Sequence, residues 1–247
     1  MNKSIWYISK YAVAPDIGDN KMTRQFGYSR EFVRKGCNVK LISSRSNGIK
    51  YPSKQKNLVE HKTVQGVDCY QIRGPEVNLG FSLKRIFSWI IFEYNLRKFI
   101  NSQNQFPDTV IVSSLSLLTI INGLYLKRKH KIKFVLEIRD IWPLTLVEIG
   151  GLSMRNPLVK ILALIEKKGY QSADCIIGTM PNLIEHVSSI VGKTSKVKSI
   201  PMGFDYDFFK DQLPLDERIK NLIPKGKFIV GYAGAIGLAN AVEDLVE

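Results

Sequence analysis

Apolar runs typical of β-strands alternate with runs typical of helices along most of this chain. The strand-like runs are short and rich in valine and isoleucine, which indicates strands buried on both faces. We predict strands at Ser4–Ser9, Asn38–Ser43, Val59–His61, Val67–Ile72, Thr109–Ser113, Lys133–Ile138, Cys175–Ile177 and Val197–Ile200. Helices are predicted at Met22–Lys35, Leu83–Ser102, Leu115–Lys129, Pro157–Gln171 and Asn182–Val191. This order predicts an α/β domain with a parallel sheet covered on both faces.

The composition changes after residue 204. Residues 205–227 contain two prolines and many charges, which indicates a connector, and a new strand at Phe228–Ala233 then leads into a glycine turn and a helix-like run. We therefore expect a Rossmann-like, doubly wound first domain at 1–204 and a connector at 205–227. Residues 228–247 would be the first strand and glycine turn of an incomplete second Rossmann domain, because they cannot bury a core alone.

The formal net charge of the 247-residue chain is +14, which favours an anionic partner such as a phosphorylated substrate or an anionic lipid surface. The three cysteines are far apart and lack metal-type spacing, so we expect buried, reduced thiols in the cytoplasm. The histidines share no motif, and we expect no metal site. We see no signal peptide, and the uncharged stretch 109–126 is better explained by a strand and a helix than by a membrane span.

The densest polar cluster follows the strand Lys133–Ile138. Ligands of doubly wound domains bind outside the carboxyl ends of the strands, so this loop is a candidate site. Asp140 could orient or deprotonate a hydroxyl, Arg139 could bind a phosphate, and Trp142 could stack on a sugar ring. Thr145 and Glu148 extend the same polar stretch. The alternative is a buried Arg139–Asp140 ion pair with Trp142 in the core.

Two glycine-containing loops follow strands and open helices, where backbone N–H groups can approach a phosphate. The first contains Gly18 and is followed by Arg24; the second contains Gly234, Gly237 and Asn240. For the first loop the alternative is an ordinary surface loop, since acidic residues flank Gly18. For the second it is a tight strand-to-helix turn without a ligand.

The predicted helix Leu83–Ser102 is unusually aromatic and has basic residues at both ends. This pattern suits the interface of an anionic membrane, and it equally suits a helix buried between the sheet and a neighbour. The basic run Lys127–Lys131 is more simply a solvated helix end. No aromatic residues are interleaved with that run, so we expect no nucleic-acid partner.

Four ordered segments resemble the family-4 retaining glycosyltransferases of the GT-B fold. The likeness is greatest to the subgroup that builds bacterial O-antigens, capsules and exopolysaccharides, including N-acetyl-fucosamine transferases. The segments are the proline-glycine loop leading into Arg24 and Glu31–Val39, the stretch from Glu137 to Gly151 with its Arg-Asp-Ile-Trp-Pro core, Ile200–Asp205 with Phe208, and Gly231–Asn240. Each is weak alone, but their order along nearly the whole chain is specific.

The resemblance implies retaining transfer of a sugar from a nucleotide-sugar donor, with a UDP-sugar as the expected donor. The expected acceptor is a lipid-linked saccharide at the inner face of the cytoplasmic membrane. The resemblance implies no cofactor and no metal, because backbone amides and basic side chains neutralise the departing diphosphate. Asp140 would be an active-site carboxylate, assisted by Arg139. Gly18, Arg24, Gly234, Gly237 and Asn240 would bind the donor, and Trp142, Thr145 and Glu148 the acceptor.

Several positions depart from the family pattern. Asp19, Cys37, Arg139 and Met202 stand where relatives often have glycine, histidine, histidine and asparagine. The family's donor-binding Arg/Lys pair and its two glutamates have no equivalent, so we expect the chain to be inactive alone. The alternatives are a non-catalytic membrane- or acceptor-binding domain and a GT-B-fold sugar-nucleotide epimerase.

Overall fold

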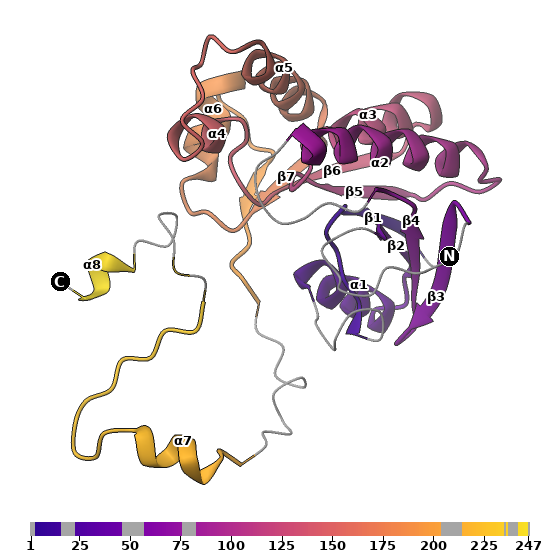
Figure 1. Cartoon of the computed structure of the whole chain (residues 1–247). Coiled ribbons are helices and arrows are strands. Elements are labelled where there is room, and N and C mark those ends of the chain that lie inside the picture. The colour runs from indigo at the N-terminus through magenta and orange to yellow at the C-terminus, as the bar shows by residue number, and fades with distance from the viewer. Residues whose placement is uncertain are drawn as a thin grey trace. The chain divides into compact units, whose positions relative to one another are not determined.

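The computed structural model describes residues 3–15, 23–45, 57–75, 83–203, 214–234, 236 and 242–246. The chain separates into two units, Met1–Gly203 and Phe204–Glu247. The first unit is an eight-stranded sheet with helices packed on both sides (Figure 1). The predicted Rossmann-like α/β fold is therefore confirmed.

The sheet has the strand order β3-β4-β2-β1-β5-β6-β7-β8. Its strands are β1 (Ser4–Ile8), β2 (Asn38–Ser44), β3 (Val59–Val64), β4 (Val67–Ile72), β5 (Thr109–Ser113), β6 (Lys133–Ile138), β7 (Cys175–Gly178) and β8 (Val197–Ser199). All neighbours pair in parallel except β3, which pairs antiparallel with β4 at the edge. The order reverses between β1 and β5, which creates the switch point where ligands of such sheets bind.

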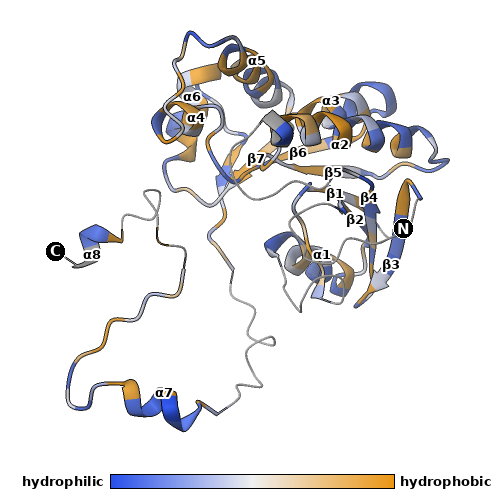
Figure 2. Cartoon of the chain, viewed as in Figure 1, coloured by the Kyte–Doolittle hydropathy of each residue, from blue (hydrophilic) through white to orange (hydrophobic). Residues whose placement is uncertain are grey.

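The helices form two unequal layers (Figure 1). They are α1 (Arg24–Arg34), α2 (Leu83–Asn101), α3 (Thr119–His130), α4 (Leu144–Glu148), α5 (Pro157–Ser172) and α6 (Leu183–Val191). Strand β1 contributes side chains to both helix layers, because successive side chains of a strand point to opposite faces of the sheet. Trp6 and Ile8 pack with α2 and α3, whereas Ile5 and Tyr7 pack with α1. The central strands are accordingly mostly apolar (Figure 2).

Two local features of the backbone use residues with positive φ. Helix α1 ends at a left-handed Gly36 (φ 80°), where the N–H groups of Gly36 and Cys37 donate to the carbonyls of Val33 and Phe32. Strands β3 and β4 are joined by the two-residue turn Gln65-Gly66, in which both residues have positive φ.

Within the first unit, two of the departures from the predicted elements concern helices. Helix α3 begins at Thr119 instead of Leu115, because residues 114–118 form hydrogen-bonded turns at the end of β5. The five-residue α4 lies in a stretch predicted to be a loop and is too short to show a helical period. Among the described helices, only α1 covers the second face of the sheet.

The second unit contains α7 (Glu217–Leu222) and α8 (Glu243–Val246). The predicted strand at 228–233 is not formed: these residues are irregular and exposed, with Phe228 95% exposed. A strand needs a neighbour to accept and donate its backbone hydrogen bonds, and the described residues of this unit supply none. Helix α7 lies in the stretch predicted as a connector, capped by the Asp216 carboxylate, which accepts from the Arg218 N–H.

Candidate functional site

The carboxyl ends of β1, β5 and β6 carry a polar and aromatic edge at the switch point of the sheet. Lys10 and Tyr11 follow β1, Ser114 follows β5, and Arg139 and Asp140 follow β6. Parallel strands bring their carboxyl ends to one edge, so these residues from distant parts of the sequence become neighbours. The ends of β5 and β6 are in direct contact, since the Arg139 N–H donates to the Ser114 hydroxyl at 3.1 Å.

On the α1 side of this edge, a buried charge pair joins the first turn of α1 to the end of β6. Arg24 Nε lies 3.7 Å from the fully buried Glu137 carboxylate, and its Nη2 donates to the Ile200 carbonyl at 3.1 Å. The guanidinium also stacks on the Tyr28 ring at 4.7 Å. Gln25 adds a long amide contact of 3.4 Å to the same carboxylate. Arg24 thus ties α1, β6 and the end of β8 together.

Several buried polar atoms on α1 and near the carboxyl ends of β1 and β5 lack a hydrogen-bond partner within the described residues. They are Arg24 Nη1, Tyr28 Oη, Ser9 Oγ and Ser113 Oγ. Burial and the negative charge of Glu137 raise the pKa of the Tyr7 hydroxyl, so it stays protonated. Burying such donors without a partner is costly, so these atoms are candidates for binding acceptor oxygens of a ligand.

On the α2 side of the edge, three aromatic side chains from separate segments meet. Trp89 Nε1 donates to the Tyr11 hydroxyl at 2.8 Å, and the Trp89 and Trp142 rings meet edge-to-face with centroids 5.5 Å apart. The Lys10 ammonium lies 4.7 Å from the centroid of Tyr11. Trp142 is half-buried against the core, and its Nε1 has no partner within the described residues. These three rings are the aromatic wall.

A carboxylic acid lies below the aromatic wall, between α2 and the start of α3. Glu93 accepts from the Thr119 hydroxyl at 2.5 Å and from the Asn122 amide at 2.7 Å, with Ser116 at 3.5 Å. Burial raises the pKa of Glu93 to about 7, although these hydrogen bonds and the charge of Lys10 oppose the rise. Glu93 therefore holds a proton through much of the range below neutrality.

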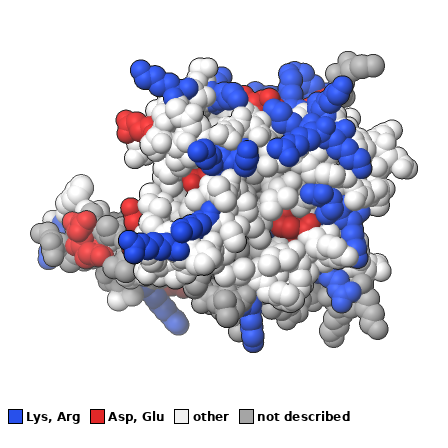
Figure 3. All heavy atoms as spheres, turned by 90° about the horizontal axis from the view of Figure 1, so that it is seen from above, with Lys and Arg blue, Asp and Glu red and all other residues white. Residues whose placement is uncertain are grey.

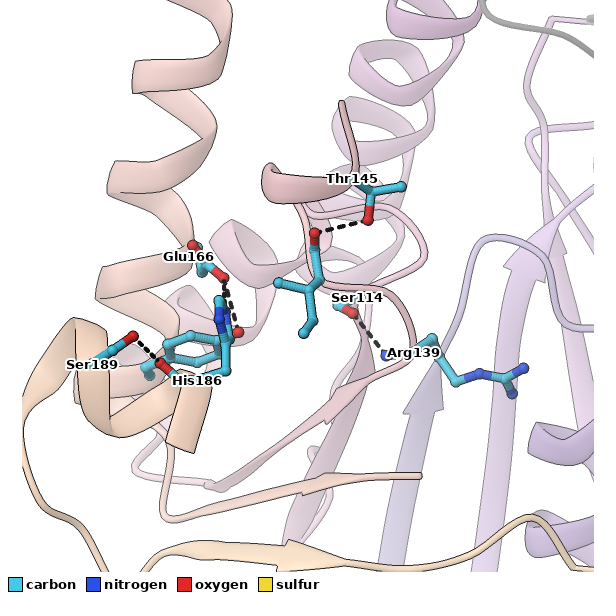
Figure 4. Close-up of polar contacts among 8 residues, drawn as sticks. Ser114, Arg139, Thr145, Glu166, His186 and Ser189 are labelled. Carbon is cyan, nitrogen blue, oxygen red and sulfur yellow. Dashed lines mark hydrogen bonds and ion pairs between the residues drawn. The ribbon is translucent and has the colours of Figure 1, made fainter. Parts of the chain in front are cut away.

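The predicted catalytic pair lies beside this wall but does not form the buried ion pair that was the alternative interpretation. Asp140 is exposed, and the Arg139 side chain extends away from the α5–α6 region (Figure 4). No hydrogen bond or ion pair of either side chain is seen within the described part of the chain. Both charges are therefore open to a ligand at the edge.

The predicted acceptor residues are only partly brought together. Trp142 is in the aromatic wall, joined to Pro143 by a cis peptide bond. The Thr145 hydroxyl donates a hydrogen bond to the Ile141 carbonyl at 2.9 Å (Figure 4). Glu148 is exposed at the end of α4. Lys10, Tyr11, Trp89 and Glu93 were not predicted as site residues. Their proximity depends on the packing of α2 across the sheet, which no spacing reveals.

The predicted donor glycines are mostly beyond what the structure describes. Gly18, Gly237 and Asn240 lie outside the described residues. Gly234 is exposed in the second unit, where an added Cβ would meet the Tyr232 hydroxyl at 2.5 Å. Among the described residues no three side chains are grouped as metal ligands. No described helix has the length and apolar character needed to cross a membrane.

Helix α2 is buried on one side and exposed on the other. Trp89, Phe92 and Leu96 are buried against the sheet, while Phe87, Ile90 and Tyr94 are 60%, 53% and 61% exposed. Exposed Lys84 and Lys98 lie on the same outward stripe. Seen from above, this face of the molecule shows lysine and arginine side chains with few acidic ones (Figure 3). We call Lys84, Phe87, Ile90, Tyr94 and Lys98 the outer stripe of α2.

No protein-family model matches the sequence, and no curated protein matches it. Solved structures match in fold. A sucrose-phosphate synthase from Thermosynechococcus elongatus gives a TM-score of 0.58 at 14% identity, covering 90% of this chain and 53% of that one. The catalytic domain of starch synthase IV from Arabidopsis thaliana, bound to ADP and acarbose, gives 0.58 at 12% identity, with coverage of 85% and 53%.

A third match is UGT89C1 of Arabidopsis thaliana complexed with UDP-L-rhamnose, with a TM-score of 0.50 at 12% identity, covering 90% of this chain and 54% of that one. The chain thus spans about half the length of these proteins. Their shared architecture is that of the GT-B glycosyltransferases. This chain has the Rossmann-like half of a GT-B glycosyltransferase fold.

Proposed function

We propose that this chain is the acceptor-binding half of a retaining glycosyltransferase. The enzyme moves a sugar from a UDP-sugar to a lipid-linked saccharide in surface-polysaccharide synthesis. The observation that carries this proposal is the carboxyl edge of the sheet, where exposed Asp140 and Arg139 adjoin the aromatic wall of Tyr11, Trp89 and Trp142. Aromatic rings beside free charges are the groups that bind a saccharide.

Each part of the edge has a proposed role. The face of Trp142 contacts the acceptor sugar, and Asp140 orients the attacking hydroxyl and receives its proton as the new glycosidic bond forms. On the α1 side, Arg24 and the unpaired donors around it bind the diphosphate that leaves with the uridine. Gly18, Gly234, Gly237 and Asn240 are also proposed to bind the donor, and we propose that transfer needs no metal ion.

The membrane location of the acceptor is a further part of the proposal. The outer stripe of α2 exposes two aromatic rings and an isoleucine between two lysines. Aromatic and basic side chains together adsorb to the interface of an anionic bilayer. The stripe would hold the protein on the inner face of the cytoplasmic membrane, where the lipid-linked saccharide is presented.

Transfer of labelled sugar from UDP-N-acetylhexosamines to a polyprenyl-diphosphate saccharide, by a protein that joins this chain to a donor-binding Rossmann domain, tests the proposal. Because this chain spans about half the length of its structural neighbours, acceptor binding is measured separately by calorimetry. Asp140→Ala should reduce kcat/KM by about 100-fold or more while leaving acceptor affinity within a few-fold. Transfer should persist in EDTA. Normal turnover in Asp140→Ala would remove Asp140 from the mechanism, and acceptor binding without transfer would favour a non-catalytic acceptor-binding domain.

A further inference from the structure

A groove lies between α4, α5 and α6, beside the carboxyl end of β6. It has a volume of about 550 Å³, within the range of ordinary small-molecule sites. Its walls are mainly apolar, formed by Pro143, Leu144, Met154, Leu164 and Ile190. Leu164 is 64% exposed and Met154 58% exposed, so the groove presents unpartnered apolar surface to solvent. Such surface is unfavourable in water and marks a place for an apolar ligand.

The wall between α5 and α6 is held by a buried polar cluster. The Glu166 carboxylate accepts from the Tyr170 hydroxyl at 2.9 Å and pairs with His186 Nε2 at 3.0 Å (Figure 4). The Ser189 hydroxyl donates to the His186 carbonyl at 2.7 Å. Glu166 also lines the groove and is 4% exposed. The cluster fixes the spacing of the two helices, which keeps the groove open.

The rim of the groove is positively charged. Lys160 and Lys167 both line it and are exposed, two turns apart on α5. Neither takes part in a hydrogen bond or ion pair seen among the described residues. An apolar channel bordered by free ammonium groups matches a hydrocarbon chain that ends in a phosphate.

The groove and the proposed acceptor site share one stretch of the chain. Pro143 and Leu144 form the groove wall nearest the sheet edge, and they directly follow Trp142 of the aromatic wall. A ligand whose head contacts Trp142 could therefore place its tail between α5 and α6.

We propose that the groove between α4, α5 and α6 binds the hydrocarbon chain of a polyprenyl phosphate, with Lys160 and Lys167 binding the phosphate. The choice of a polyprenyl carrier rests on the proposed transfer to a lipid-linked saccharide. The groove itself is inferred only from its shape, its apolar lining and its charge. Single-chain phospholipids share the same chemistry and are the competing occupant that the experiment separates.

Binding of farnesyl phosphate to the 247-residue chain, measured by calorimetry at monomeric lipid concentrations, tests the proposal. Leu164→Asp places a charge in the groove and should weaken binding at least tenfold. Ile161→Asp is the matched control, because Ile161 is 54% exposed on the same helix but does not line the groove. It should bind within twofold of the wild type. Undetectable binding, or equal losses in both variants, would overturn the proposal.

The lysines are tested in the same way. Lys160→Ala with Lys167→Ala should weaken farnesyl phosphate about tenfold or more and leave the weaker binding of farnesol unchanged. Lys168→Ala, a neighbouring exposed lysine outside the groove lining, is the control and should change neither affinity. If farnesol binds as tightly as farnesyl phosphate, the lysines do not bind a phosphate. Tighter binding of lysophosphatidic acid would reject the polyprenyl carrier and assign the groove to a membrane phospholipid.

These measurements contain no nucleotide sugar and no saccharide. Loss of the proposed transferase activity would therefore leave the farnesyl phosphate result intact. Conversely, if Leu164→Asp leaves the rate of transfer to a lipid-linked acceptor unchanged, the proposed lipid site in the groove is wrong while the proposed function stands.

Discussion

At the scale of single residues, Glu93 is the group whose surroundings most change its chemistry. It is a carboxylic acid enclosed by α2 and α3, with hydroxyl and amide donors around it and Lys10 nearby. Burial raises its pKa to about 7, so the folded protein binds a proton that the unfolded chain releases at lower pH. The ionised form of Glu93 is therefore a source of instability above neutrality.

This imbalance predicts the pH dependence of the free energy of unfolding. The folded state binds more protons than the unfolded state between the ordinary pKa of glutamate and about 7. The contribution of Glu93 is thus fully present at low pH and is lost as pH rises through 7, by up to about 3 kcal/mol. In Glu93→Gln the amide nitrogen can donate to the Thr119 hydroxyl while the oxygen accepts from Asn122.

Urea unfolding of wild type and Glu93→Gln from pH 5 to pH 8 measures the effect. The difference in the free energy of unfolding between the two proteins should change by on the order of 2–3 kcal/mol across that range. The variant should gain stability relative to the wild type at high pH. Parallel pH profiles would show that Glu93 ionises as an ordinary carboxyl group.

At the scale of elements, the hairpin between β3 and β4 shows a local conflict between residue and conformation. Gln65 has φ of 49° in a turn whose two residues both need positive φ. This conformation is unfavourable by about 1 kcal/mol or more for most non-glycine residues, and by less for asparagine. Gln65→Asn should therefore raise the free energy of unfolding by about 0.5–1 kcal/mol.

Gly66→Ala is the opposite test in the same turn. Its φ is 80°, and the added Cβ would lie 3.0 Å from Val33 Cγ1, so the variant should lose about 1 kcal/mol or more. Urea denaturation measures both variants. A stabilised Gly66→Ala, or a destabilised Gln65→Asn, would contradict the assigned turn.

The outer stripe of α2 leads to a prediction about membranes. Phe87→Glu removes an exposed ring and adds a negative charge, so partition onto vesicles containing phosphatidylglycerol should fall by roughly tenfold or more. Raising the salt concentration should weaken wild-type binding by screening.

Ile184→Glu on α6 is the control for Phe87→Glu, because Ile184 is 46% exposed and lies outside the stripe. It should bind vesicles as the wild type does. Sedimentation with vesicles measures all three proteins, and absence of wild-type binding at low salt would reject the interfacial role of α2.

At the scale of the whole molecule, the sequence predicted the sheet better than the site. Strands such as β1 and β6 are buried on both faces, so their sequences are short apolar runs. Such runs can be recognised from the sequence without knowledge of the tertiary structure. Arg139, Asp140 and Trp142 were chosen as candidates because each lies just past a strand, and their roles stay predictions. Tyr11, Trp89 and Glu93 were missed, since they meet only when α2 packs across the sheet. The strand at 228–233 failed because apolar pattern alone supplies no pairing partner.

The claim that the carboxyl edge binds the acceptor is tested most directly through the protein's own tryptophans. The chain has three: Trp89 and Trp142 in the aromatic wall, and Trp6, 1% exposed in the core. A titration with farnesyl-diphosphate-linked N-acetylhexosamine, followed by NMR of the ¹⁵N-labelled indole groups, reports all three at once. We predict that the Trp89 and Trp142 resonances shift with a common saturation curve while Trp6 stays unchanged. Saturable binding that leaves Trp89 and Trp142 unperturbed would contradict the account.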